Sequence, residues 1–541
     1  MKQGTTLLSL PSLLSMLLLT GCGTQNTPPA FSIGGTVVNL SPATGNLVLQ
    51  NNLKDSLTVT ANGNFAFRIP VASGGSYNVT ISVQPSNPAQ MCGVTNGSGI
   101  ATASITNVQV NCGHNEWAWE KGSTAVNADP VYGTQGVVGM TNTPGARQFP
   151  AVWSGDPGSL WLFGGYATDN VAKTYVLVND LWKFNSGQWT WLGGSNVGNQ
   201  PGTSGTLGVP STNNVPGGRY EAVSWTDSSG SVWLFGGTGL DSAGSVGSLN
   251  DLWKYSQGQW TWMSGSNVVG QHGTYGTLGV ASPNNVPGAR IEAVSWSDSA
   301  GNLWLFGGFG LDSAGSNGML SDLWKYSAGQ WTWVSGSNLV NRNGVYGMQG
   351  IPTSGNAPGA RDSAISWTDS SGNLWLFGGT GNGSPGQSGF LNDLWKYSNG
   401  QWTWMAGSAS AGQSGVYGTQ SVASQSNSPG ARRNAVSWTD SSGNLWLFGG
   451  NAIDSVGGMG LLNDLWKYSN GEWTWVSGPK LINQNGMYGT QGTLGPGNIP
   501  GARLMAGGWI DANGNLWLFG GYGAPGSGTE GNLNDLWMYM P

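Results

Sequence analysis

A motif of about seventy residues recurs along most of this chain, and its period limits the folds open to the chain. Residues 287 to 333 carry one copy, and the chain after about residue 116 repeats it. The arginine of its PGAR-like segment returns in steps of 71 or 72 residues, as Arg147, Arg219, Arg290, Arg361, Arg432 and Arg503. A fixed period of several tens of residues is typical of a solenoid, an array or a propeller.

Each repeat contains four short apolar runs separated by turn residues. In the copy above they span 293–296, 303–306, 323–326 and 331–334, and each has the length of a strand. The intervening polar segments suit tight hairpins. One repeat therefore predicts a four-stranded antiparallel sheet with two apolar faces, and such sheets bury both faces when they stack radially. The sequence predicts an all-β, six-bladed propeller.

The tryptophans indicate how this propeller closes. Five complete repeats carry five tryptophans each, but the sixth ends with Trp509, Trp517 and Trp537. The missing pair occurs at the other end, as Trp117 and Trp119, which completes the 30 tryptophans of the chain. We therefore expect an N-terminal strand to complete the last sheet and remove its open edge.

The glycine pair after an apolar strand, the following aromatic residue and the later tryptophan resemble kelch repeats. The resemblance covers residues 116–541 and extends to the central domain of galactose oxidase. It implies a kelch-type propeller, a fold that includes both enzymes and binding proteins. The period departs from the roughly 50 residues usual for kelch repeats, and the excess lies in the loops.

The first residues look like a lipoprotein leader. Residues 1–21 combine Lys2 with an apolar core at 7–19, as in a secretion signal. The segment LTGC resembles the bacterial lipobox, which implies lipidation of Cys22, a tether at 22–30 and anchoring by several acyl chains. Gly23 in place of an acidic residue implies the outer membrane of a Gram-negative bacterium. A cysteine placed there by chance is the alternative.

Residues 31–113 predict a separate small β-sandwich of immunoglobulin-like or transthyretin-like type. Apolar and polar residues alternate from Tyr77 to Val83, and Asn62-Gly63 marks a hairpin. Cys92 and Cys112 remain once Cys22 carries lipid, and in an exported chain they predict a disulfide. A metal or redox role for this pair is the alternative, although no CxxC motif is present.

Composition and missing residue types exclude several functions. Charged residues are 8% of the chain and the net charge is −6, which argues against nucleic acid as a partner. The resemblance to galactose oxidase implies that copper chemistry of its kind needs a cysteine and histidine ligands. Residues 116–541 contain no cysteine and one histidine, His272, so we do not expect this chemistry. No glycine-rich phosphate loop opens a helix. We therefore expect no catalytic triad, metal or cofactor.

Two sets of aspartates recur. One set begins the short turns, and capping of the turn or a calcium loop would explain it. Its members are Asp227, Asp298, Asp369, Asp440 and Asp511. The other set precedes Leu-Trp in every repeat. Pairing with the repeated arginine is the structural explanation for this set, and contact with a ligand is the alternative. Its members are Asp180, Asp251, Asp322, Asp393, Asp464 and Asp535.

Loop lengths indicate which face of the propeller carries function. In the third repeat the connections on one face total 10 residues and those on the other total 40. Binding residues concentrate on long loops held by a rigid scaffold, so we expect the site on the long-loop face. Tyrosines stand 15 residues before five of the arginines, with Ser204 in the sixth place. These residues lock the loops or, alternatively, the arginines recognise an acidic sugar or carboxylate at the central funnel.

Positions where the repeats differ are further candidates for ligand binding. They are Glu221, Glu292, Asp362, Arg433 and Met505 on the inner strands, with Tyr166, Phe309 and Tyr522 after the glycine pair. The repeated tryptophans are explained by the core between sheets, with sugar platforms as the alternative. Two functions fit: a cell-envelope lipoprotein whose propeller binds a protein or glycan, or a carbohydrate-active propeller of epimerase or mutarotase type that uses Glu221, Glu292 or Asp362 with an arginine.

Overall fold

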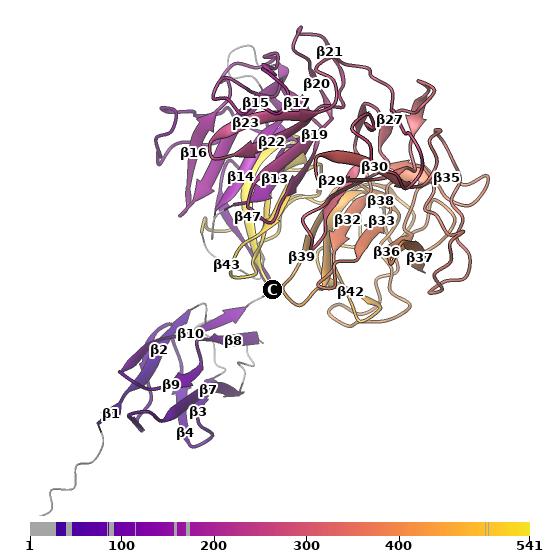
Figure 1. The fold of residues 1–541 in the computed structure, drawn as a ribbon. Coiled ribbons are helices and arrows are strands. Elements are labelled where there is room, and N and C mark those ends of the chain that lie inside the picture. Colours follow the sequence, from indigo (N-terminus) through magenta and orange to yellow (C-terminus); the bar gives the residue numbers. More distant parts are fainter. Residues whose placement is uncertain are drawn as a thin grey trace, which may run out of the picture. The chain divides into compact units, whose positions relative to one another are not determined.

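A computed structural model describes residues 29–38, 40, 46–83, 85, 91–113, 115–155, 159–168, 174–492, 494–495 and 497–541. The predicted leader and Cys22 lie outside these residues. The chain divides into two compact units, one up to Gly113 and one from His114 (Figure 1). All regular elements in the described residues are strands, and no helix there is long and apolar enough to cross a membrane.

The N-terminal unit contains two four-stranded sheets and a two-stranded one. Apolar side chains of both larger sheets, among them Ile33, Leu49, Val79 and Val110, form one buried core. The disulfide between Cys92 and Cys112 is present, as predicted, and joins neighbouring strands. The sheets are β5 (Gly63–Ala66), β2 (Ile33–Val38), β10 (Ile105–Gly113), β8 (Met91–Thr95); β4 (Asp55–Val59), β3 (Leu47–Asn51), β7 (Ser76–Val83), β9 (Ser98–Ile100); and β1 (Ala30–Phe31), β6 (Val71–Ala72).

The C-terminal unit repeats one antiparallel sheet, numbered here by the order of its arginines. In the first, fifth and sixth sheets the middle strands run through to the long-loop face. The first contains β12 (Arg147–Gln148), β13 (Ala151–Ser154), β14 (Leu160–Thr168), β15 (Tyr175–Asn185) and β16 (Gln188–Gly193). The fifth contains β38 (Arg432–Arg433), β39 (Val436–Thr439), β40 (Leu445–Ile453), β41 (Met459–Ser469) and β42 (Glu472–Ser477). The sixth contains β44 (Arg503–Leu504), β45 (Gly507–Ile510), β46 (Leu516–Gly523), β47 (Gly531–Met540), β11 (Glu116–Lys121) and β43 (Leu494–Gly495).

In the second, third and fourth sheets the same strands are interrupted, and a small three-stranded sheet continues each of them. The second contains β18 (Val223–Thr226), β19 (Val232–Phe235), β22 (Leu252–Ser256) and β23 (Gln259–Ser264), with β17 (Arg219–Tyr220), β20 (Thr238–Leu240) and β21 (Val246–Ser248). The third contains β25 (Val294–Ser297), β26 (Leu303–Phe306), β29 (Leu323–Ser327) and β30 (Gln330–Ser335), with β24 (Arg290–Ile291), β27 (Phe309–Leu311) and β28 (Asn317–Met319). The fourth contains β32 (Ile365–Thr368), β33 (Leu374–Phe377), β36 (Leu394–Ser398) and β37 (Gln401–Ala406), with β31 (Arg361–Asp362), β34 (Thr380–Asn382) and β35 (Ser388–Phe390).

The inner strands of these sheets neighbour one another in a closed series. The order is β13, β18, β25, β32, β39, β45 and again β13. Serine hydroxyls join them, since Ser295 Oγ donates to the Ser224 carbonyl at 3.2 Å and Ser366 Oγ to the Ser295 carbonyl at 3.2 Å. Sheets stacked radially around an axis are the arrangement of a β-propeller.

Tryptophan and aliphatic side chains fill the space between neighbouring sheets. One such cluster contains Val294, Trp296 and Phe306 of the third sheet with Leu374 and Trp395 of the fourth. Most of the repeated tryptophans are buried in clusters of this kind, which is the core role that the sequence favoured for them. Glycine is needed where the sheets approach most closely: a Cβ at Gly307, which has a φ of 64°, would lie 2.8 Å from the Arg361 carbonyl oxygen.

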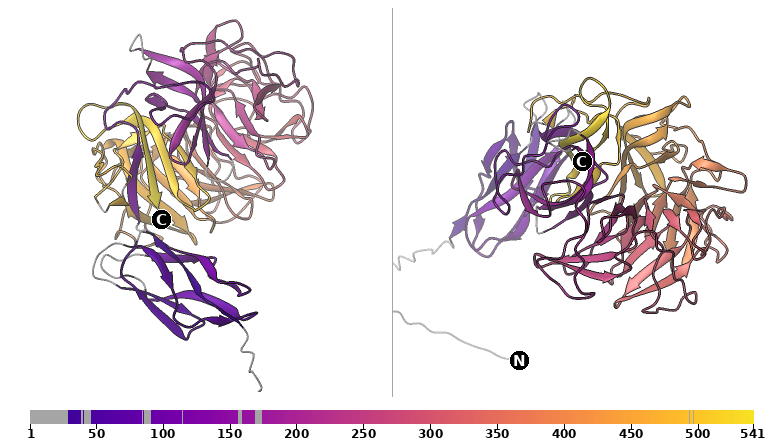
Figure 2. Two further views of the ribbon diagram at one scale, coloured as in Figure 1. Left: turned by 90° about the vertical axis from the view of Figure 1, so that its left-hand side faces the viewer. Right: turned by 90° about the horizontal axis from the view of Figure 1, so that it is seen from above.

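The N-terminal strand β11 lies in the sixth sheet between β47 and the short β43, as the tryptophan count predicted. It pairs antiparallel with β47, placing Trp117 opposite Tyr539 and Trp119 opposite Trp537. In Figure 2 this purple strand lies among the yellow C-terminal ones. Trp117 is 2% exposed and contacts Phe448 of the fifth sheet. The two ends of the unit therefore share one sheet and one core.

We predict that Trp117→Ala destabilises the unit as much as Trp402→Ala, its equivalent in the fourth sheet, by about 3–5 kcal/mol each, because both remove a buried ring from the core between sheets. Chemical denaturation of the two variants measures this. A large loss for Trp402→Ala with none for Trp117→Ala would contradict a stabilising role for β11.

Candidate functional site

The six repeated arginines lie inside the sheets and do not face the funnel. Each is 0–1% exposed, and each guanidinium binds both oxygens of the aspartate before Leu-Trp. Arg290 donates to Asp322 at 2.8 Å through both terminal nitrogens and to the Gly307 carbonyl at 2.9 Å. This pairing is the structural explanation given for the repeated aspartates, and it corrects the alternative hypothesis that Arg147, Arg219, Arg290, Arg361, Arg432 and Arg503 meet a ligand at the funnel.

The aspartate of each pair has further donors. In the third sheet, Asp322 accepts from the Trp324 indole at 2.6 Å and from the Tyr275 hydroxyl at 2.6 Å. Burial alone would lower the pKa of Arg290, but the Asp322 carboxylate raises it above its usual value. The loop tyrosines are thus locked to the sheets. The second sheet has Ser204 at this position, and Asp251 there is 4% exposed where Asp322 is fully buried.

A second repeated feature does face the funnel. The residue two positions after each arginine has a left-handed backbone, a conformation that costs a non-glycine residue about 1–3 kcal/mol. These residues are Phe149 (φ 53°), Glu221 (60°), Glu292 (51°), Ser363 (55°), Asn434 (52°) and Met505 (61°). Their backbones bond from sheet to sheet: Ser363 N–H donates to the Glu292 carbonyl at 2.9 Å and Asn434 N–H to the Ser363 carbonyl at 3.0 Å.

Comparable bonds join Glu292 to Glu221, Met505 to Asn434 and Phe149 to Met505. We call these six residues the mouth ring. Their backbone is the same in every sheet, whereas their side chains are all different except for the two glutamates. A repeat kept constant in its core but varied at one ring of positions indicates a site whose chemistry is set by those side chains.

Three carboxyl groups gather at the mouth ring. Asn434 Nδ2 donates to Glu292 Oε1 at 3.0 Å across the ring, and Ser363 Oγ donates to Asp362 Oδ1 at 2.9 Å. Burial and the neighbouring Glu292 raise the pKa of Glu221 to about 8, although Thr238 donates to it at 3.3 Å. Burial and Glu292 likewise raise the pKa of Asp362 to about 6. Both groups therefore keep their protons at a higher pH than ordinary carboxyls.

Aromatic side chains lie beside these carboxyls. Tyr166 packs against Tyr220 at 5.2 Å and stacks on Tyr175 at 5.3 Å, both between ring centroids, and Phe149 lies 6.0 Å from Tyr220. Tyr175 is 43% exposed. This aromatic row borders the first two sheets of the mouth.

The remaining predicted residues take separate places on the same face. The Arg433 guanidinium lies over the Phe390 ring at 5.3 Å, and its charge lowers the pKa of Asp362 in part. Phe309 on β27 is 37% exposed. Met505 and Tyr522 line a cavity of about 470 Å³ together with Leu504, Gln148 and Asn451.

The sequence prediction mixed two kinds of position. Glu221, Glu292 and Met505 belong to the mouth ring, whereas Asp362 and Arg433 precede it by one residue. Phe149, Ser363 and Asn434 were missed. Counting two positions from every arginine would have found them, but the left-handed backbone that singles out this position has no signature in the sequence.

The turn aspartates cap their own turns. Asp298 accepts from the backbone of Ala300 and Asn302 at 3.0 and 2.9 Å and from the Trp304 indole at 2.8 Å. These bonds are the turn chemistry that the sequence favoured over a calcium loop. Within the described residues, no group of three or more His, Cys, Asp or Glu side chains is placed to hold a metal ion.

The radial four-stranded sheets place the chain in the class of β-propeller proteins. No family model and no curated protein matches the sequence. Among solved structures it is similar to YjhT, at 15% identity with a TM-score of 0.43, over 73% of this chain and 95% of that one. It is also similar to a fungal alcohol oxidase of the AA5 family in complex with copper, at 14% identity with a TM-score of 0.39, over 75% of this chain and 77% of that one.

We predict that Arg361→Leu lowers the free energy of unfolding by about 3–5 kcal/mol, because it leaves the Asp393 charge buried without its partner. Denaturant unfolding measures this loss. The control is Arg361→Leu combined with Asp393→Leu, which removes both charges and is expected to cost less than the single change. Equal losses would contradict the role given to the ion pair.

Glu221 should make stability depend on pH. Its folded pKa of about 8 exceeds the ordinary carboxyl value, so folding takes up a proton between those two values and stability falls as pH rises through that window. Glu221→Gln removes this titration, and its melting temperature relative to the native chain should be higher at pH 9 than at pH 5. Parallel melting curves across this range would contradict the assignment.

Proposed function

We propose that this chain is a cell-envelope lipoprotein whose propeller, of six-bladed kelch type, binds a protein or glycan at the mouth ring on its long-loop face. The observation that carries this proposal is the variation of the mouth ring. One backbone conformation is kept six times, at a cost in strain, while the side chains it presents differ. A ring with a purely structural role would not require such different side chains.

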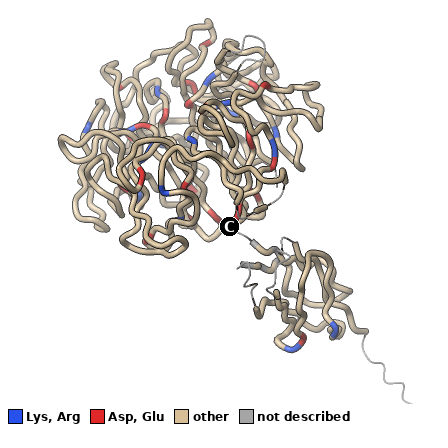
Figure 3. Tube along the Cα trace, turned by 180° about the vertical axis from the view of Figure 1, so that it is seen from behind, with Lys and Arg blue, Asp and Glu red and all other residues tan. Residues whose placement is uncertain are grey.

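The chemistry of the mouth favours an uncharged or cationic polar ligand over an acidic one. The arginines expected to clamp a carboxylate are engaged with aspartates, and Glu221, Glu292 and Asp362 supply carboxyl groups instead. Carboxyl, amide and hydroxyl groups beside an aromatic row offer hydrogen bonds and a flat apolar surface to one ligand. Charged groups are sparse over the rest of the unit (Figure 3).

The remaining features of this proposal come from the sequence. Export, lipidation at Cys22 and placement in the outer membrane follow from the leader, and the immunoglobulin-like or transthyretin-like unit would serve as a spacer. Metal, cofactor and nucleic acid have no part in the proposal.

A carbohydrate-active function is the second candidate, and one observation favours it. Carboxyls that keep a proton near neutral pH can act as general acids, and the raised pKa values of Glu221 and Asp362 fit that role. Arg433 is the arginine close enough to Asp362 to affect its charge.

The purified protein applied to a glycan array tests both candidates. We expect binding that Glu292→Gln weakens about tenfold, because the change replaces the carboxyl group that Asn434 contacts with an amide. Glu472→Gln, at the start of β42 on the opposite face, is the control. Binding without turnover supports the binding module, whereas product formation lost in Glu292→Gln supports the enzyme. Unchanged binding in Glu292→Gln would remove the mouth ring from the proposal.

A further inference from the structure

A tyrosine at the boundary between the first and second sheets is more exposed than its counterparts in the later sheets. The third strand of the later sheets carries a tyrosine at one repeated position, and this tyrosine is buried as Tyr326, Tyr397, Tyr468 and Tyr539, at 0–7% exposure. Its equivalent Tyr255, on the second sheet, is partly exposed. Its ring still lies 5.7 Å from the Trp161 ring of the first sheet, between centroids, and its exposed part lines two cavities.

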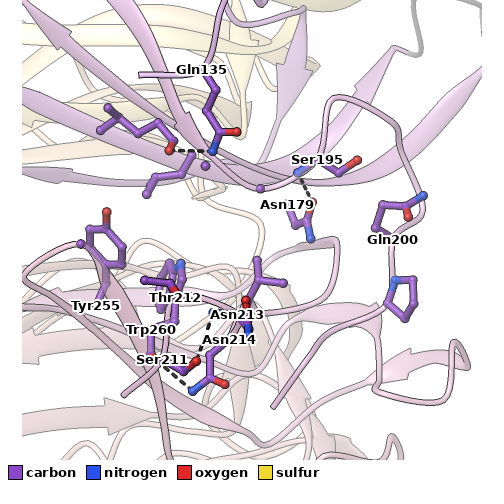
Figure 4. A pocket seen from close by; sticks show the side chains of 17 residues that line it. Gln135, Asn179, Ser195, Gln200, Ser211, Thr212, Asn213, Asn214, Tyr255 and Trp260 are labelled. Carbon is purple, nitrogen blue, oxygen red and sulfur yellow. Dashed lines mark hydrogen bonds between the residues drawn. The ribbon is translucent and has the colours of Figure 1, made fainter. Parts of the chain in front are cut away.

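Two cavities meet at Tyr255. One of about 550 Å³ lies between the first and second sheets and is lined by Gln135, Gln200, Thr212 and Asn213 (Figure 4). The other, of about 440 Å³, is lined by Trp153, Trp161 and residues 229–232 and 255–258. Both include Tyr255 and Gly258, so the two cavities adjoin, and we call them together the seam groove.

Two links that join neighbouring sheets elsewhere are missing at this boundary within the described residues. The mouth ring shows no bond from Glu221 to Phe149 within the described residues. Trp225 and Trp296 donate their indole N–H to the next sheet at 2.9 and 3.0 Å, but Trp153 stacks on Trp161 of its own sheet instead. Other links persist at this boundary, where Ser224 Oγ donates to the Val152 carbonyl at 3.3 Å, and Trp509 stacks on Trp517 of its own sheet as Trp153 does on Trp161.

The lining of the groove selects against charged ligands. Neither cavity is lined by a charged side chain. Gln135 donates its amide to the Leu192 carbonyl at 3.1 Å, and Gln200 donates to the Gly198 carbonyl at 2.9 Å. These bonds orient the two carboxamides and leave their oxygens free to accept hydrogen bonds from a ligand.

The outer strand β23 does not offer its Trp260 carbonyl to an added peptide strand. The Trp260 carbonyl on β23 already accepts from Ser211 N–H at 3.3 Å and from Asn214 Nδ2 at 3.1 Å. The groups left to a ligand are carboxamides, hydroxyls and the Tyr255 ring, which suit a chain of hydroxyl groups. We propose that the seam groove binds a neutral oligosaccharide, at a site separate from the mouth ring.

Binding of neutral hexasaccharides to the purified protein tests this proposal. Cellohexaose, maltohexaose and hexa-N-acetylchitohexaose are compared with their monosaccharides by calorimetry. We expect at least one hexasaccharide to bind more than tenfold tighter than its monosaccharide, because the groove spans two cavities. Gln135→Ala combined with Gln200→Ala should weaken that binding about tenfold, since two hydrogen bonds are lost.

The chain supplies a matched control between the fourth and fifth sheets. Gln349 and Gln413 hold the same repeat positions and make the same bonds, to the Met405 and Ala411 carbonyls. Gln349→Ala combined with Gln413→Ala should change binding less than twofold. Absence of hexasaccharide binding, or equal losses in both double variants, would overturn the proposal. Loss in Glu292→Gln alone would place the sugar at the mouth ring and overturn the seam groove while leaving the proposed function standing.

Discussion

The buried pair of arginine and aspartate is the interaction on which each sheet of the propeller depends. Removing two charges from water costs several kcal/mol per ion unless every donor and acceptor is satisfied. The glycine carbonyls, the Trp324 indole and the Tyr275 hydroxyl meet that requirement around Arg290 and Asp322. Because so many groups converge on one carboxylate, the repeat tolerates little variation there.

That constraint separates scaffold from site. The arginine fixes the start of the inner strand, and the left-handed residue two positions later carries a side chain that is not needed for the ion pair. Variation is therefore concentrated in the mouth ring. The pairing of Glu292 with Asn434 shows how a ring of equivalent positions becomes an asymmetric site.

Much of the fold could be predicted from the sequence, but less of the site could. The repeat length, the strand pattern and the displaced tryptophan pair were enough to predict the sheets and the place of β11. The sequence offered the pairing of these arginines with the aspartates before Leu-Trp, but it does not reveal how completely the aspartates enclose them, so recognition of a ligand at the funnel stayed open as the alternative. Glu292 and Asn434 lie 142 residues apart, so their contact depends on the ring geometry.

The shared sixth sheet has a consequence for the order of folding. Five sheets are each built from a nearly continuous stretch of chain and can form as that stretch emerges during synthesis. The sixth needs β11 and β47, which are separated by about four hundred residues. Until β47 is made, the backbone N–H and C=O groups of β11 have no strand to pair with and its tryptophans have no core to enter. The nascent chain therefore exposes an aggregation-prone strand through most of its synthesis.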